Sequence, residues 1–125
     1  MNVVDSSGWL EYLTDGADAD FFASSILDGE QLIIPTICIY EVFKRVLVQF
    51  GEERALDAAG SMGDGMIMDL NRQIAVEAAS FSARLKLAMA DSIILATARA
   101  YEAVLWTQDE HFKDIEGVRY IEKKL

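Results

Sequence analysis

Four acidic residues stand where the chain could bring carboxylates together. Asp5 ends the first apolar run of the sequence, and Asp109 follows the apolar run at 104–106. Glu41 lies one turn inside an apolar helical stretch, and Asp91 opens another helical stretch that is apolar on nearly all sides. Two carboxylates about 5 Å apart repel by roughly 3 kcal/mol at an effective dielectric constant near 20. Four that converge therefore need a cation if they are to stay ionised.

The type of ligand indicates which cation this would be. Oxygen ligands without a nearby cluster of Cys or His select a hard cation, Mg2+ or Mn2+, and disfavour zinc. Such a cation suits hydrolysis of a phosphodiester, because it activates water and stabilises the attacking and leaving oxygens. The single histidine, His111, is interpreted as a surface residue that makes no metal site.

Each aspartate also has a simpler explanation as a capping residue. Asp5 and Asp91 could be helix N-caps, and Asp109 could cap the turn that follows it. Asp69 is a fifth candidate acid, but with Asn71 beside it we favour capping of the next helix. For Glu41, the alternative is a salt bridge to Lys44 or Arg45, three and four residues further along the helix.

The acids can meet only if the elements that carry them end at one edge of a sheet. Short apolar runs predict strands at 2–4, 32–34, 66–68, 104–106 and 118–121. Patterns with a period near 3.6 predict helices at 7–13, 19–27, 37–50, 52–59, 71–87 and 91–103. Strands separated by helices imply crossover connections, hence a three-layer α/β/α fold with a mostly parallel central sheet of about five strands. Ligands of such sheets bind beyond the carboxyl ends of the strands.

Composition narrows the class of protein further. The chain has 125 residues and a formal net charge of -10, which excludes binding of nucleic acid or anionic membrane by bulk positive charge. The length predicts a single domain over residues 1–125. One cysteine, Cys38, cannot form an internal disulfide, and neither a secretory signal nor a run of about 20 apolar residues is found. We therefore expect a cytoplasmic protein with no membrane partner.

Four short motifs, in this order along the chain, resemble those of the PIN domain, and specifically of VapC-type ribonuclease toxins. They are Val3-Val4-Asp5-Ser6-Ser7 with Trp9, Tyr40-Glu41-Val42, Ala90-Asp91-Ser92-Ile93-Ile94-Leu95-Ala96-Thr97-Ala98, and Leu105-Trp106-Thr107-Gln108-Asp109 with Phe112. Each motif alone is weak, whereas the ordered set is specific. The alternation of strands and helices extends the resemblance over essentially the whole chain.

The resemblance implies an endoribonuclease that depends on Mg2+ or Mn2+. Its acidic cluster, catalytic and metal-binding, would be Asp5, Glu41, Asp91 and Asp109. Thr107 matches the family's hydroxyl residue before the last aspartate and would orient a ligand or water, unless it is simply a strand residue. Ser6 is a second supporting hydroxyl of the same kind.

The resemblance also implies partners, namely an RNA substrate, a second copy of the chain in a homodimer, and a cognate antitoxin in an apolar groove. Four aromatic residues at helical spacing either line these surfaces or belong to the core: Trp9, Tyr12, Phe43 and Phe50. Cations near the rim of the acidic site, among them Lys44, Arg45 and Lys86, would attract the phosphates of RNA. Lys86 is alternatively a solvated residue at a helix end.

Two other classes of protein are compatible with a small acidic α/β domain. One is a PIN-like interaction module without catalysis, which would not need all four acids. The other is a phospho-receiver signalling domain, which needs an acidic pair after the first strand and a Lys after a late strand. Here Asp5 stands among serines, and Thr107-Gln108 follows the late strand. A receiver would use Asp69 as its phosphoacceptor.

Overall fold

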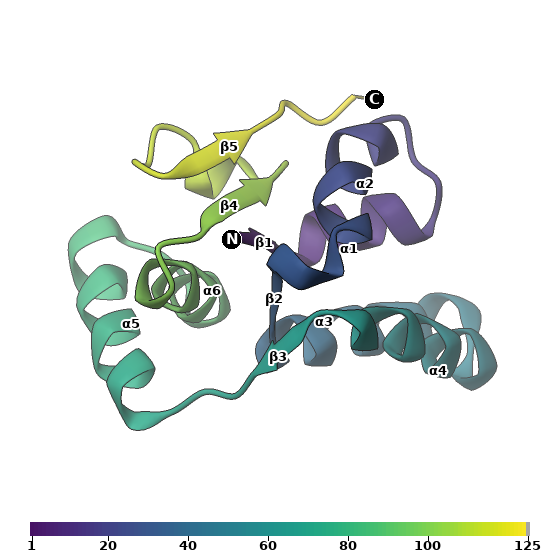
Figure 1. Cartoon of the computed structure of the whole chain (residues 1–125), viewed down its shortest axis with the longest axis horizontal. Coiled ribbons are helices and arrows are strands. Elements are labelled where there is room, and N and C mark those ends of the chain that lie inside the picture. Colours follow the sequence, from purple (N-terminus) through teal and green to yellow (C-terminus); the bar gives the residue numbers. More distant parts are fainter. Residues whose placement is uncertain (125) are drawn as a thin grey trace.

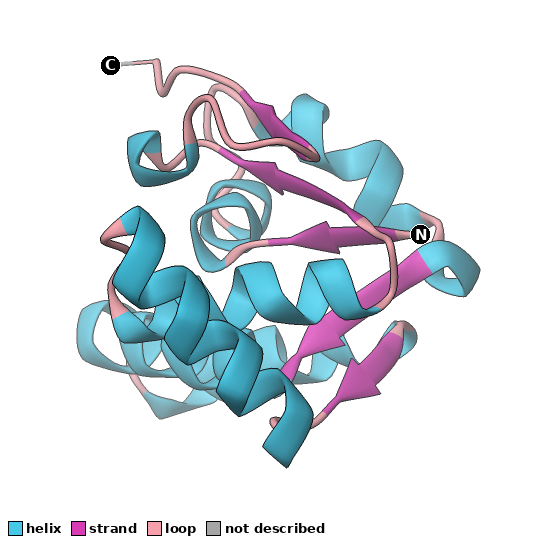
Figure 2. Cartoon of the chain, turned by 90° about the vertical axis from the view of Figure 1, so that its left-hand side faces the viewer, coloured by secondary structure: helices cyan, strands magenta, loops and turns pink. Residues whose placement is uncertain are grey.

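A central sheet of five parallel strands organises the protein, and the computed structural model describes residues 1–124. The strands are β1 (Asn2–Val4), β2 (Leu32–Pro35), β3 (Met66–Met68), β4 (Val104–Thr107) and β5 (Val118–Tyr120). Their order across the sheet is β3-β2-β1-β4-β5, and every neighbouring pair is parallel. Figure 2 shows the strands side by side in one twisted sheet. The central position of β1 puts the end of this strand next to the end of β4.

Helices cover both faces of the sheet. They are α1 (Ser6–Leu13), α2 (Ala19–Leu27), α3 (Thr36–Phe50), α4 (Glu52–Ser61), α5 (Arg72–Leu85) and α6 (Met89–Ala100), with single 3-10 turns η1 (Gly29–Gln31), η2 (Met62–Asp64) and η3 (Glu110–Phe112). In Figure 1, α5 and α6 lie on one side of the strands, and α1 and α2 lie on the other. The predicted three-layer α/β/α class with a parallel sheet of about five strands is confirmed.

Two helices end a few residues before the predicted positions, in each case near a residue with a left-handed backbone. The helix expected over 71–87 ends at Leu85, because Lys86 adopts a φ of 60°. The helix expected over 91–103 runs from Met89 to Ala100, and Glu102 beyond it has a φ of 51°. These are local effects that apolar periodicity does not detect, because a single residue in the αL region ends a helix without altering the pattern around it.

The core is built from the apolar runs that predicted the strands. Val3, Val4 and Ile33 are fully buried, as expected for parallel strands covered on both faces. Residues 92–98 of α6 are all buried as well, so the prediction of a helix enclosed on nearly all sides is confirmed. Cys38 is a buried free thiol. Within residues 1–124, no helix is long and apolar enough to cross a membrane.

Gly8 allows α1 to lie directly against the core, and we predict that alanine there destabilises the fold. A Cβ at this position would lie 2.6 Å from Phe22 Cε1 and 2.7 Å from Val4 Cγ1. Overpacking of this kind costs about 1–3 kcal/mol, which chemical denaturation would measure as a lower free energy of unfolding. Gly60→Ala is the matched control, since no atom lies within 4 Å of its Cβ position. In helix α4 that change should instead stabilise by roughly 0.5–1 kcal/mol. Equal stabilities of the two variants would contradict the prediction.

Candidate metal centre

The four acids of the sequence motifs line one cleft at the carboxyl ends of the strands. The cleft has a volume of about 780 Å3, and its walls include Asp5, Glu41, Asp91 and Asp109. Asp5 directly follows β1 and Asp109 comes two residues after β4, and these strands are neighbours in the sheet. Helices α3 and α6 bring Glu41 and Asp91 from the second and third crossovers. The structure therefore brings together all four acids, as expected, and their chemical role stays a prediction.

Asp5 is the most buried of the four acids and the most firmly held. Its side chain is 3% exposed. Its Oδ1 accepts hydrogen bonds from Ser7 Oγ at 2.7 Å and from the Gly8 amide at 2.9 Å, and its Oδ2 accepts from Thr107 Oγ1 at 2.6 Å. Asp5 is thus the N-cap of α1, so the capping explanation is confirmed for this residue, and its role in a metal site stays a prediction.

Burial raises the pKa of Asp5 to about 6, against an ordinary value of 3.8. The hydrogen bonds from Thr107, Ser7 and Gly8 lower this pKa, but they do not offset the loss of solvent, and the charge of Asp109 raises it further. The ionised form of this carboxylate therefore lacks a compensating positive charge. A bound cation would supply that charge.

Asp91 and Glu41 reach the cleft from helices. Burial, followed by the charges of Asp109 and Glu41, raises the pKa of Asp91 to about 6, whereas His111 lowers it. Asp91 sits in the first turn of α6 but is not its N-cap, which is Ala88. Glu41 Oε1 accepts a hydrogen bond of 2.6 Å from Ser6 Oγ. The supporting role predicted for Ser6 therefore has a partner in the structure.

The cations near the cleft do not neutralise the acids. Among residues 1–124, none of the four acids forms an ion pair with a lysine or arginine, so the alternative of a salt bridge from Glu41 to Lys44 or Arg45 is wrong. Both cations instead line the cleft, as does Lys123, which sequence reasoning missed. Lys86 is exposed and is not part of the cleft wall. Asp69 is exposed beyond the edge strand β3 and also lies outside the wall, and Asn71 is the residue that caps α5.

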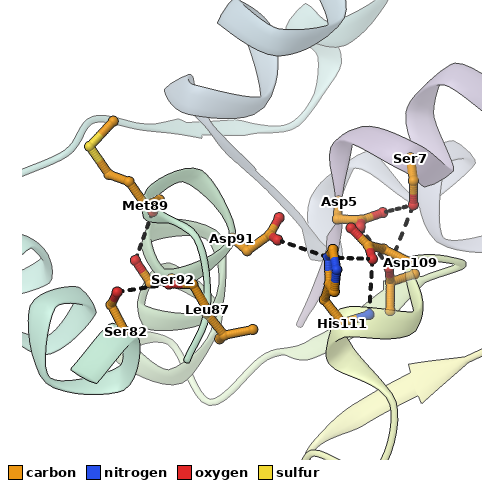
Figure 3. Close-up of polar contacts among 10 residues, drawn as sticks. Asp5, Ser7, Ser82, Leu87, Met89, Asp91, Ser92, Asp109 and His111 are labelled. Atoms are coloured by element: carbon orange, nitrogen blue, oxygen red, sulfur yellow. Dashed lines mark hydrogen bonds and ion pairs between the residues drawn. The ribbon is translucent and has the colours of Figure 1, made fainter. Parts of the chain in front are cut away.

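His111 is placed differently from the sequence interpretation. Its side chain is 69% exposed, as predicted, but its Nδ1 lies 3.1 Å from Asp109 Oδ1 and 3.7 Å from Asp91 Oδ2. Figure 3 shows the ring between these two carboxylates. The three side chains form a group whose ligand atoms lie within 4.8 Å of one another, a proximity that the interpretation of His111 as a surface residue did not include.

Thr107 connects the two central strand ends, and its loss should weaken the site. Its Oγ1 donates to Asp5 Oδ2 and accepts from the Asp109 amide at 2.9 Å. Thr107→Val removes both bonds, so we expect a stability loss of about 1–3 kcal/mol and Mn2+ binding weakened roughly 10–100-fold. Calorimetric titration with Mn2+ and a denaturation curve would measure the two effects. In the control, Thr97→Val, the lost hydroxyl bonds only Ile93 O of its own helix, and Mn2+ affinity should not change. Equal Mn2+ affinities would contradict the positioning role of Thr107.

Ser7 and Gln108 are further site residues that sequence reasoning missed. Ser7 Oγ donates to Asp5 and accepts from the Gln108 amide at 3.3 Å. Gln108 is 8% exposed, and its Oε1 has no hydrogen-bond partner among residues 1–124. Nothing in the sequence separates Ser7 from Ser6, because only the three-dimensional structure shows which serine faces which acid. A buried acceptor without a partner in the cleft wall suits a bound cation or its water.

The aromatic residues divide between core and surface. Trp9 is 1% exposed, so it belongs to the core and lines no surface. Tyr12 and Phe43 are partly buried against that core. Phe50 is exposed at 44%, with the Arg54 guanidinium 4.3 Å from its ring centre. Of the four, Phe50 is the residue most available to a partner.

Comparison with known proteins identifies the class. The family model of the PIN domain matches residues 3–118, so the chain belongs to the PIN domain family. The resemblance stated from the sequence motifs is confirmed. No curated protein matches the chain by sequence.

Several solved structures that resemble the chain are toxins or toxin-antitoxin complexes. A toxin-antitoxin complex from Klebsiella pneumoniae is 23% identical with a TM-score of 0.78, and the match covers 95% of this chain and 96% of that one. VapC20 of Mycobacterium tuberculosis, a toxin that cleaves the sarcin-ricin loop, is 13% identical with a TM-score of 0.78, covering 93% and 95%. DNA-bound VapBC from Salmonella typhimurium is 18% identical with a TM-score of 0.74, covering 97% and 98%. At these identities the likeness establishes the fold.

Proposed function

We propose that this chain is a metal-dependent endoribonuclease, a VapC-like toxin that hydrolyses RNA phosphodiester bonds. The observation that carries the proposal is the group of four carboxylates from four separate segments around one cleft of a PIN domain. Within residues 1–124 no lysine or arginine pairs with them. Four acids at one place without a lysine or arginine partner are costly to keep ionised unless a cation completes the site.

The residues present fit Mg2+ or Mn2+. Asp5, Glu41, Asp91 and Asp109 would hold the cation, and their oxygens are the ligands that these ions prefer. When bound, the cation would supply an activated water and a positive charge opposite the scissile phosphate. The chain itself contributes orientation. Thr107 fixes Asp5 and Ser6 fixes Glu41, each through a hydrogen bond of 2.6 Å.

The charges around the cleft support RNA as a substrate that is held weakly without metal. Lys44, Arg45 and Lys123 line the cleft and can contact phosphates on either side of the bond to be cleaved. The net charge of -10 opposes tight, metal-free binding of RNA. Binding and cleavage would therefore depend on the same cation.

A cognate antitoxin is the partner that we propose, following the toxin-antitoxin complexes among the similar structures. A second, smaller hollow of about 200 Å3 adjoins the acidic cleft, and the two share Thr14 in their walls. Leu13, Phe50 and Arg54 contribute to the smaller hollow, which suits an apolar peptide segment. A small neighbouring gene that encodes a DNA-binding N-terminus and an apolar tail would support this partner. A homodimer also remains a prediction from the resemblance.

Cleavage of single-stranded RNA by the purified chain tests the function. With Mn2+ or Mg2+ we expect defined fragments on a gel, and with a chelator we expect none. Asp91→Asn should abolish cleavage, because it removes a ligand whose neighbours Asp109 and Glu41 remain uncompensated. Asp69→Asn is the matched control, since Asp69 is exposed and lies outside the cleft wall.

Two outcomes would contradict the proposal. Cleavage by Asp91→Asn at the rate of the parent chain would mean that the acidic cluster is not the catalytic site. Intact RNA in Mn2+ together with tight binding of an antitoxin would favour the non-catalytic interaction module. Labelling of Asp69 by acetyl phosphate would favour the receiver class.

A further inference from the structure

His111 contacts two acids of the cluster from a turn that one of these acids caps. It lies on the 3-10 turn η3, whose N-cap Asp109 accepts a hydrogen bond of 2.9 Å from the His111 amide. The same carboxylate oxygen, Asp109 Oδ1, lies 3.1 Å from His111 Nδ1. Backbone and ring of one residue therefore converge on one oxygen of the acid. This contact orients the ring nitrogen Nδ1 toward the carboxylates of Asp109 and Asp91.

The distances in this group match those between ligands of one metal ion. Two ligand atoms on neighbouring corners of an octahedron, each about 2.1 Å from the metal, lie roughly 3.0 Å apart. His111 Nδ1 lies 3.1 Å from Asp109 Oδ1 and 3.7 Å from Asp91 Oδ2. All three ligand atoms fall within 4.8 Å of one another. A small adjustment of Asp91, which lies on the cleft wall, would complete the third corner.

A simple ion pair explains this placement less well. The imidazole is 69% exposed, and exposed ion pairs contribute about 0–1 kcal/mol. This small free energy is a weak reason for the ring to stay beside two carboxylates. Within residues 1–124, neither carboxylate has a lysine or arginine partner. A shared cation would satisfy both acids and the ring nitrogen at once.

We propose that His111 is a metal ligand that makes this site select Mn2+ and similar transition-metal ions over Mg2+. The inference rests on the proposed function, because it assigns the selectivity of the same site. Imidazole nitrogen suits Mn2+ and later first-row ions, whereas Mg2+ prefers oxygen and water. Asp91, Asp109 and His111 together form a mixed nitrogen and oxygen set, unlike the oxygen-only set expected from the acids alone.

The chain offers a direct spectroscopic test, because His111 is its only histidine. The protein is prepared without a histidine tag and loaded with Mn2+, and pulsed electron paramagnetic resonance records the coupling of the metal to nearby nitrogen-14. We expect an imidazole nitrogen signal in the parent chain and none in His111→Asn or His111→Ala. Any histidine signal can come only from this residue.

Affinity measurements give a second readout. Calorimetric titrations should show Mn2+ binding weakened at least about tenfold in His111→Asn, the lower end of the range for metal-site changes. Mg2+ affinity should change less than about threefold, because that ion makes little use of nitrogen ligands. Glu110→Gln is the matched control on the same turn. It alters charge without removing a nitrogen ligand, so the ratio of Mn2+ to Mg2+ affinity should stay constant.

The outcomes separate this inference from the proposed function. Bound Mn2+ without an imidazole signal, or an unchanged affinity ratio in both His111 variants, would overturn the role of His111 and leave the nuclease intact. An imidazole signal in a protein that does not cleave RNA would support the ligand and contradict the nuclease. No bound Mn2+ in the parent chain would overturn both.

Discussion

Asp5→Asn is expected to abolish RNA cleavage and, at the same time, to stabilise the cation-free protein. Asp5 is 3% exposed, and burial raises its pKa to about 6 from 3.8. At neutral pH the folded chain must therefore keep a charge that its surroundings disfavour. Since one pKa unit corresponds to about 1.4 kcal/mol, the ionised carboxylate costs about 3 kcal/mol of stability. The neutral amide avoids most of this cost.

The gain in stability will be smaller than that figure, because asparagine cannot reproduce every hydrogen bond of the carboxylate. Thr107 Oγ1 donates to Asp5 Oδ2 and already accepts from the Asp109 amide, so an amide nitrogen facing it would leave one proton without an acceptor. We expect a net gain of about 1–2 kcal/mol. Loss of a cation ligand that stabilises the transition state by several kcal/mol should lower the cleavage rate roughly a thousandfold or more.

Denaturation without metal and RNA cleavage with Mn2+ would measure the two effects on the same preparation. Asp69→Asn, which neutralises an exposed acid outside the cleft, should leave both quantities unchanged. An Asp5→Asn variant that is inactive and also less stable would indicate a purely structural carboxylate. One that is more stable and still active would show that the cation does not need Asp5. Only the combination of lost activity and gained stability identifies a carboxylate that is positioned to bind a cation and is destabilising without one.

The sequence predicted those features that depend on apolar periodicity or on which residues follow a strand. Apolar runs predicted all five strands, and β1 and β3 begin and end at the predicted residues. The convergence of the acids followed from one physical rule, since residues that follow neighbouring parallel strands must meet at the same edge. Asp5 and Asp109 obey it directly because β1 pairs with β4.

Other features depend on local geometry that a single sequence does not encode as a pattern. His111 faces two of the acids because Asp109 caps a one-turn helix and thereby holds His111 beside its own carboxylate. Ser6 and Ser7 are chemically identical, yet one donates to Glu41 and the other to Asp5, since successive residues of α1 point in different directions. Lys123 comes from the end of the chain beyond the last strand, where no periodicity indicates a position. The placement of these residues depends on turn geometry and on side-chain direction, which the sequence pattern does not show.

The stabilisation of the fold by Mn2+ is expected to depend steeply on pH, and the raised pKa values fix the sign. Without metal, the folded chain binds more protons than the unfolded chain between about pH 4 and 6, because the pKa of Asp5 is raised to about 6. This group's contribution to stability therefore falls as the pH rises through that range and stays low above it. A cation reverses the effect only where the carboxylates are ionised.

The size of this change can be worked out from two carboxylates. At pH 5, Asp5 and Asp91, each with a pKa raised to about 6, are roughly ten to one protonated, so the apparent Mn2+ affinity falls about a hundredfold. With Mn2+ at about 100 times its dissociation constant at pH 7.5, the added stability of about 2.7 kcal/mol drops to about 0.4 kcal/mol at pH 5. Thermal unfolding with and without Mn2+ at the two pH values would measure the difference. Asp5→Asn should show a much smaller Mn2+ shift at either pH, whereas Asp69→Asn should follow the parent chain. Equal Mn2+ shifts at pH 5 and 7.5 in the parent would mean that the ion binds away from these acids, because carboxylates that must lose protons to bind a cation cannot give a pH-independent gain.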